Sequence, residues 1–275
     1  MTVERSVARE IMDVVPWLIA AYLVICAAAY FGHRMFMYFP DPARIPPNAA
    51  GLDGVEEIEF AAADGTKLIA WYAPAADGKP TILYFHGNAA NAANRAPKID
   101  MMIESGFGVF YLNNRGYGGS GGSPSEANNV ADAVAAYDHL RGLGVPTDKI
   151  AAFGESLGSG QAVQLAAERP VGAVVLEAAL TSTVEVGRSI YFWLPLSLLI
   201  TDQYNVERDI ARVTAPLLIL HGERDEVIPV AMGRRIYNAA NEPKRVELFR
   251  DGRHNDLFDH GAWERMRDFL LALER

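Results

Sequence analysis

The chain has 275 residues, of which 50% are hydrophobic and 21% charged, and its formal net charge is −9. This length suits one large domain with a substantial core, and the composition argues against a largely disordered chain. The negative charge and the scattered Lys and Arg residues argue against nucleic acid as a partner. Cys26 is the only cysteine, which excludes an intramolecular disulfide and a thiolate metal cluster.

An uncharged apolar run occupies residues 14–31, after a flank of mixed charge at residues 1–13. Its length is close to the roughly 20 residues that a helix needs to cross hydrocarbon. Trp17 and Tyr30 near its ends suit the two membrane interfaces. We therefore predict a single-pass transmembrane anchor at residues 14–34, and hence a membrane protein. A signal peptide that is cleaved on export and a buried core helix are the open alternatives.

A connector rich in Pro, Gly and Ala follows at residues 35–54, and the main domain is predicted at residues 55–275. Short apolar runs in this domain predict strands. They are residues 58–62, 68–72, 82–85, 109–112, 150–153, 174–176, 217–220 and 246–249. The helical patterns between and after them are residues 92–105, 126–143, 156–168, 231–240 and 262–273.

This alternation of strands and helices predicts an α/β fold with a mostly parallel eight-stranded sheet and helices on both faces. The first two strands are separated by Asp64-Gly65, a hairpin turn signal, so that pair should be antiparallel.

The strand at residues 150–153 runs into Gly154-Glu155-Ser156-Leu157-Gly158 and then a helical pattern. This G-x-S-x-G sequence between strand and helix is typical of a nucleophile held on a tight turn, where glycines permit close helix–strand packing. Ser156 is therefore the candidate nucleophile. The alternative is that Ser156 only caps a helix.

A serine nucleophile needs a base, and the base needs an orienting carboxylate. Asp225 follows the strand at residues 217–220, and His254 follows the last predicted strand, so the order is Ser, acid, His. Glu223 and Glu226 are weaker candidates for the acid. The remaining histidines are expected to have structural roles, such as turn hydrogen bonds. They are His33, His86, His139, His221 and His260.

An oxyanion hole is the third element that acyl transfer requires. The sequence His86-Gly87-Asn88 follows the third predicted strand, and the expected donors are the backbone amides of Asn88 and Leu157. The alternative is that this sequence is a simple turn.

From about Tyr38 to the C-terminus, the chain resembles the α/β-hydrolase family, within it the membrane-anchored branch that includes protein depalmitoylases, acylglycerol lipases and serine aminopeptidase-like proteins. The resemblance rests on six short motifs. They are MYFP at 37–40, HGN at 86–88, NNRGYGGSGGSP at 113–124, GESLG at 154–158, HGERDEVIP at 221–229 and RHND at 253–256. The resemblance implies the fold and a hydrolytic mechanism, whereas substrates in this branch are diverse.

Two other functional classes compete with this interpretation. Residues 116–121 fit the dinucleotide-binding pattern G-x-G-x-x-G, but the next helix begins only after Pro124 and no acidic residue ends the following strand. Arg115, beside this loop, is either a hydrogen-bonding or a structural residue. A non-catalytic binding protein with the same fold is the second competitor, and the intact Ser, Asp and His argue against it.

We expect a serine hydrolase that cleaves carboxylic esters or thioesters of lipid-like acyl substrates, without a metal or organic cofactor. The insertion at about residues 181–212 is the predicted lid, and its apolar run suits an acyl pocket, the bilayer or internal packing. Its candidate substrate-binding residues are Tyr191, Phe192, Trp193, Leu194 and Leu196. An aminopeptidase-like activity is the alternative, with Glu155 or Glu177 as the acidic subsite. The oligomeric state stays undetermined.

Overall fold

The computed structural model of this protein describes residues 2–273. Its main feature is an eight-stranded sheet with the order β10-β9-β8-β7-β4-β6-β3-β2. β2 pairs antiparallel with β3, β3 pairs antiparallel with β6, and the other pairs are parallel. The strands are β2 (Glu56–Ala61), β3 (Lys67–Ala73), β4 (Thr81–Phe85), β6 (Gly108–Asn113), β7 (Ile150–Glu155), β8 (Ala173–Glu177), β9 (Leu217–Gly222) and β10 (Lys244–Phe249). The expected α/β-hydrolase architecture is confirmed.

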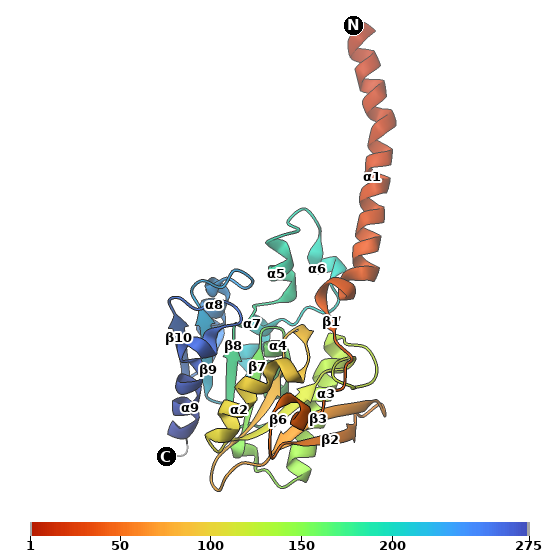
Figure 1. Ribbon diagram of the computed structural model, residues 1–275. Helices are drawn as coiled ribbons and strands as arrows, with labels where there is room; N and C mark the ends of the chain where they lie inside the picture. Colours follow the sequence, from red (N-terminus) through yellow and green to blue (C-terminus); the bar gives the residue numbers. More distant parts are fainter. Residues whose placement is uncertain (1, 274–275) are drawn as a thin grey trace.

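Helices cover both faces of this sheet (Figure 1). Buried residues of α3 (Glu126–Gly142), α4 (Gly158–Glu168) and α8 (Val230–Ala239) share one apolar cluster with the strands. Buried residues of α2 (Ala96–Glu104) and α9 (Ala262–Ala272) form the cluster on the other face. The 3₁₀ helices of the main domain outside the lid are Ala92–Arg95, Thr147–Lys149 and Leu257–His260.

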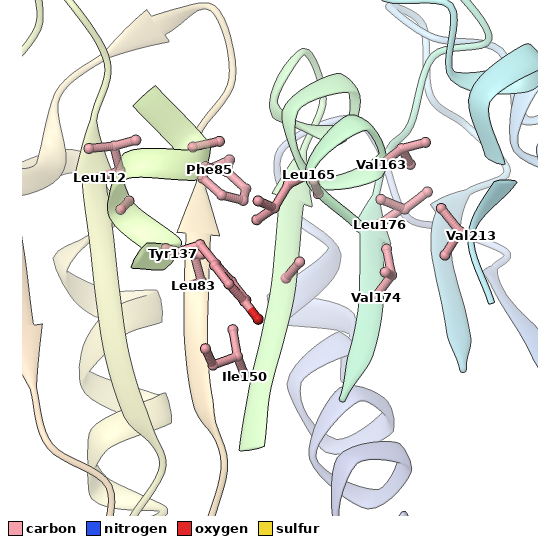
Figure 2. Packing of buried hydrophobic residues seen from close by; sticks show 14 of the residues in the cluster. Leu83, Phe85, Leu112, Tyr137, Ile150, Val163, Leu165, Val174, Leu176 and Val213 are labelled. Carbon is pink, nitrogen blue, oxygen red and sulfur yellow. The ribbon is translucent and has the colours of Figure 1, made fainter. Parts of the chain in front are cut away.

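Successive side chains of a strand point to opposite faces of the sheet, so each central strand contributes residues to both apolar clusters. Leu83 and Phe85 of β4 pack under α3 and α4, whereas Ile82 and Tyr84 pack toward α2 and α9. Figure 2 shows the first of these clusters, which includes Leu83 of β4 and Tyr137 of α3. Because both faces are covered, the central strands are continuous apolar runs, and the carboxyl ends of the parallel strands meet at one edge.

The insertion between β8 and β9 contains three short helices and a 3₁₀ turn. They are α5 (Thr183–Arg188), α6 (Leu196–Leu199), α7 (Val206–Asp209) and Ile210–Arg212. α7 belongs to the sheet core through the buried residue Val206. α5 and α6 stand above the sheet, between it and the N-terminal helix (Figure 1). The predicted lid at residues 181–212 is thus partly core and partly an exposed cover.

The N-terminal helix α1 runs from Thr2 to Met37 and projects away from the domain (Figure 1). It continues through the predicted division between residues 1–13 and 14–34. The segment Asp13–Met37 is the one helix in the described range that is long and apolar enough to cross a membrane. A signal sequence near the N-terminus passes the same test of length and apolarity, so these features alone establish an apolar N-terminal helix that is either an anchor or a signal sequence.

The segment after α1, for which a connector is predicted at residues 35–54, is attached to the domain. β1 (Phe39–Pro40) pairs in parallel with β5 (Ala89–Ala90), directly after the HGN sequence. The 3₁₀ helix Pro47–Ala50 follows, and the side chains of Tyr38 and Leu52 are buried. The sequence lacks apolar periodicity here because single residues, and not a helix face, make the contacts.

Candidate active site

Ser156 lies on the tight turn between β7 and α4, and its backbone adopts a left-handed conformation with φ of 53°. Non-glycine residues seldom adopt this conformation, and those that do are often found at functional sites. A Cβ atom at Gly154 would come within 2.6 Å of the Gly158 carbonyl oxygen, and one at Gly158 within 2.2 Å of the Phe85 carbonyl oxygen. The turn is fixed further by the Ser156 amide, which donates to the Glu177 carbonyl at 2.8 Å.

His254 joins Ser156 to Asp225. Its Nε2 lies 3.0 Å from Ser156 Oγ, and its Nδ1 lies 2.8 Å from Asp225 Oδ2. Because a carboxylate only accepts, Nδ1 carries the proton in this pair and Nε2 is left to accept from the serine hydroxyl. The structure thus brings together the three residues that the sequence singled out, from the ends of β7, β9 and β10.

Asp225 is held as a carboxylate by its surroundings. Its side chain is buried, and its Oδ1 accepts hydrogen bonds from the amides of Val227 at 2.9 Å and Ile228 at 2.7 Å. Burial would raise the pKa of Asp225, but the hydrogen bonds from His254 and from these amides outweigh burial and hold that pKa below its usual value. The carboxylate is therefore ionised near neutral pH and can orient the imidazole.

The alternative acids and the other buried histidines have different surroundings. Glu223 and Glu226 are exposed, and Glu223 pairs with Arg234. His221 donates from Nε2 to the Ile228 carbonyl at 2.9 Å, and burial lowers its pKa. His86 donates from Nδ1 to the Gly87 carbonyl, and burial lowers the pKa of His86 to about 4. Both imidazoles thus make the turn hydrogen bonds expected from their positions.

The two expected oxyanion donors border the same space as Ser156. Asn88 and Leu157 both line the cavity at the serine. The Asn88 carbonyl is fixed by the Phe39 amide at 2.9 Å and by the Tyr117 hydroxyl at 2.7 Å. Within residues 2–273, neither the Asn88 amide nor the Leu157 amide donates to a backbone carbonyl, so both N–H groups are able to donate a hydrogen bond to a ligand oxygen.

A cavity of about 730 Å³ opens at Ser156 and His254. Its walls come from the nucleophile turn, the lid and the last turns of α1. Of the five lid residues singled out by sequence, Tyr191, Leu194 and Leu196 line the cavity. Phe192 and Trp193 do not line it. Both are exposed, and the Trp193 ring lies near Tyr22 of α1, because the turn at residues 190–194 directs them outward.

A buried group of charges lies behind the nucleophile turn. The sequence motifs indicate its carboxylates, Glu155 and Glu177, only as a candidate acidic subsite, and do not identify their cationic partners. Arg95 Nε donates to Glu155 at 3.0 Å, and Lys98 Nζ donates to both oxygens of Glu177 at 2.8 and 2.9 Å. Tyr84 also donates to Glu155. Although burial opposes ionisation of Glu155, Lys98 and Arg95 hold the pKa of Glu155 well below its usual value. The need for such partners could have been predicted, because Glu155 and Glu177 end buried strands and a buried carboxylate requires a cationic partner.

Other parts of the chain pack against the glycine-rich loop at residues 116–121. The Gly118 amide donates to the Asp41 carbonyl at 2.9 Å, and Arg44 packs against Gly119. Arg115 forms a bidentate pair with buried Asp132, at 2.7 and 2.8 Å. The loop therefore holds the connector, through Asp41 and Arg44, against the domain. No group of three His, Cys, Asp or Glu residues that could hold a metal ion is found in the part of the chain described here.

The sheet and the serine turn define an α/β hydrolase. The sequence model of the family described as "Serine aminopeptidase, S33" matches residues 76–199 and 198–261. Uncharacterized protein Rv2307c of Mycobacterium tuberculosis is 36% identical over 259 residues, covering 93% of this chain and 91% of that protein. The α/β hydrolase domain-containing protein WAV2 of Arabidopsis thaliana is 32% identical over 241 residues, covering 78% of each chain.

Solved structures show the same fold. The Pyrococcus furiosus esterase Pf2001 superposes with a TM-score of 0.69 at 20% identity, covering 87% of this chain and 98% of that one. The chain therefore belongs to the serine aminopeptidase S33 family of α/β hydrolases, and this membership supports a hydrolase activity in general terms.

Proposed function

We propose that this protein is a serine hydrolase that cleaves carboxylic ester or thioester bonds of lipid-like acyl substrates through an acyl-enzyme on Ser156. One observation carries the proposal: the unbroken series Ser156, His254 and Asp225, with contacts of 3.0 and 2.8 Å, opens into a largely apolar cavity. An apolar pocket with a few converging polar groups is typical of a site for such substrates.

In the proposed mechanism, His254 Nε2 takes the proton of Ser156 as Oγ bonds to the carbonyl carbon. The amides of Asn88 and Leu157 stabilise the negative charge that develops on the carbonyl oxygen. As the ester or thioester bond breaks, His254 returns its proton to the leaving oxygen or sulfur. Water then transfers a proton to His254 and attacks the acyl carbon. The bond between that carbon and Ser156 Oγ breaks, and His254 returns the proton to Oγ, which releases the carboxylic acid and restores Ser156.

The charges around the cavity favour an acyl substrate over a peptide N-terminus. Glu155 is the one acidic residue among the described cavity-lining residues. Its carboxylate is already paired with Arg95 and lies 3.5 Å from Lys98. A cationic amino group would therefore find no uncompensated carboxylate there, whereas an acyl chain needs none.

The proposal includes α1 as a single-pass membrane anchor. The apolar side chains between Val14 and Val24 are exposed, including those of Leu18, Ile19 and Leu23. In water, this surface would be unfavourable by about 25 cal/mol for each Å². Insertion in a bilayer removes that cost and holds the active site near lipid.

The proposal is tested by substituting the nucleophile. Ser156→Ala should abolish hydrolysis of acyl esters and thioesters and labelling by a fluorophosphonate probe. Ser189→Ala, which changes an exposed serine of the lid, is the control and should react as the wild type does. Equal labelling of Ser156→Ala and wild type would contradict the assignment. A panel that includes aminoacyl amides distinguishes an esterase from a peptidase.

A further inference from the structure

The last turns of α1 form part of the active-site cavity. Ala29, His33, Phe36 and Met37 all line the cavity that contains Ser156. Their spacing of four, three and one residues puts them on one face of the helix. A helix that only tethered the domain to a membrane would not need to line the cavity that contains the nucleophile.

Polar contacts fix this helix face against the lid. Arg34 binds Asp202 through two hydrogen bonds of 2.9 and 3.0 Å. The Thr201 hydroxyl donates to His33 Nε2 at 3.0 Å, since His33 Nδ1 donates to the Tyr30 carbonyl at 2.7 Å. Further up the helix, the Tyr22 hydroxyl donates to the Trp193 carbonyl at 3.0 Å. The position of α1 is therefore set by directional bonds as well as by apolar packing.

The opposite part of the cavity wall belongs to the lid, and the outer surface beside it is apolar. Ile190, Phe192 and Leu198 are among the most exposed hydrophobic residues of the lid, and Phe31 and Phe36 are equally exposed on α1. Figure 1 shows α1, α5 and α6 on the same side of the domain. Exposed apolar side chains thus lie on both α1 and the lid, the two elements that wall the cavity, and an acyl chain leaving a bilayer requires such apolar contacts.

From this arrangement we infer that α1 is the outer wall of the acyl-chain site, and that the substrate is a membrane-resident acyl ester whose chain lies along the face containing Ala29, His33 and Phe36. The inference rests on the proposed hydrolase function and adds the source and path of the substrate. α1 then determines chain-length preference in addition to anchoring the protein.

A matched pair of substitutions in the full-length protein tests this role. Ala29→Phe adds bulk to the cavity wall, whereas Ala28→Phe adds the same bulk to an exposed neighbour outside the cavity. In phosphatidylcholine vesicles, we expect Ala29→Phe to lower the ratio of kcat/KM for palmitoyl over acetyl esters about tenfold, because displacing two methylenes from the wall has about that effect. Ala28→Phe should leave the ratio unchanged. Equal ratios in the two variants would overturn the inference.

A second measurement does not depend on how a variant folds. An alkyl fluorophosphonate with a photoreactive diazirine near the end of a long chain is allowed to react with Ser156 in vesicles and is then irradiated. Cross-links should map to the peptide containing residues 29–37. Cross-links to the core helices or to water alone would overturn the inference. Failure of the probe to react with Ser156 would instead contradict the proposed hydrolase, so the two failures are distinguishable.

Discussion

Arg34 and Asp202 join the N-terminal helix to the lid across 168 positions of sequence, with Arg34 Nε and Nη2 donating to the two carboxylate oxygens at 2.9 and 3.0 Å. The Asp202 side chain is only 4% exposed and that of Arg34 is 51% exposed. Tyr38 donates to the same carboxylate at 3.1 Å, and its oxygen lies 3.0 Å from that of Tyr204. Asn129 of α3 then donates to Tyr204 at 2.9 Å, so a continuous polar connection leads from α1 into the core.

Loss of the Arg34 side chain should destabilise the domain. Arg34→Gln removes the positive charge beside the nearly buried Asp202 carboxylate. The free energy of unfolding should therefore fall by about 1–2 kcal/mol. Arg188→Gln is the control. The Arg188 side chain is 52% exposed, much as that of Arg34 is, but its partner Glu185 is 31% exposed and so is far less buried than Asp202. That variant should change stability by less than about 0.5 kcal/mol. Denaturation of both in the same detergent measures the difference, and equal losses would contradict the prediction.

Substitutions of two neighbouring carboxylates test which residue is the acid of the proposed triad. Asp225→Asn should lower kcat by about three or more orders of magnitude, because the His254 tautomer is no longer fixed. Glu226→Gln changes an exposed carboxylate next in sequence and should be nearly silent. Steady-state kinetics on a short acyl ester compares them. A damaging Glu226→Gln with a mild Asp225→Asn would show that the wrong acid was assigned.

The fate of the N-terminal helix can be determined directly. If α1 is a permanent anchor, the full-length protein should stay with membranes after high salt and alkaline extraction, because a spanning helix is held by its apolar surface and not by charge. Mass spectrometry of the isolated protein should find the N-terminal residues intact. A mature N-terminus at or near Tyr30 would instead establish a cleaved signal peptide, and with it the loss of most of α1.

Much of this architecture could be predicted because short-range patterns determine it. All eight strands of the main sheet follow from apolar runs, and Ser156, Asp225 and His254 could be grouped because each follows a parallel strand. The contact between Arg34 and Asp202 could not be predicted, since neither residue lies in a motif. Phe192 and Trp193 were expected near the substrate on composition alone, which cannot show which way a turn directs its side chains.

The pH dependence of stability should include a contribution from His86. Burial lowers its pKa to about 4 in the folded protein, whereas an unfolded histidine has a pKa near about 6.5. The folded state therefore binds fewer protons between these values, so the contribution is present above the unfolded pKa and is lost as the pH falls. Between about pH 8 and pH 5, this residue should lower the free energy of unfolding by about 2 kcal/mol.

His86→Gln is the test of that contribution. The variant cannot titrate, so its free energy of unfolding should fall less steeply between neutral and acidic pH than that of the wild type. Its absolute stability is expected to be lower, because the Nδ1 hydrogen bond to Gly87 and the Asn114 hydrogen bond to Nε2 are altered. The slope and not the absolute value is decisive. Identical slopes for the two proteins would contradict the assignment of a neutral buried imidazole.

The outward-facing lid residues should contact the membrane surface and not the acyl chain once it is bound in the cavity. Phe192 is 83% exposed, and the Trp193 ring lies 6.3 Å from that of Tyr22 on α1. Phe192→Ser with Trp193→Ser should reduce hydrolysis of a palmitoyl ester held in vesicles roughly tenfold, since two aromatic groups are lost from the interface. Hydrolysis of a water-soluble acetyl ester should be unchanged.

Leu143→Ser is the matched control for that double substitution. Leu143 at the end of α3 is 47% exposed, as Trp193 is, but it belongs to the main domain outside the lid. Its replacement should leave both substrates unaffected. If the lid variant lost the two activities in equal proportion, together with a lower melting temperature, then Phe192 and Trp193 would be packing residues of the lid. A loss confined to the vesicle-bound ester requires that these side chains contact lipid, because the cavity lining at Tyr191, Leu194 and Leu196 is unaltered in that variant.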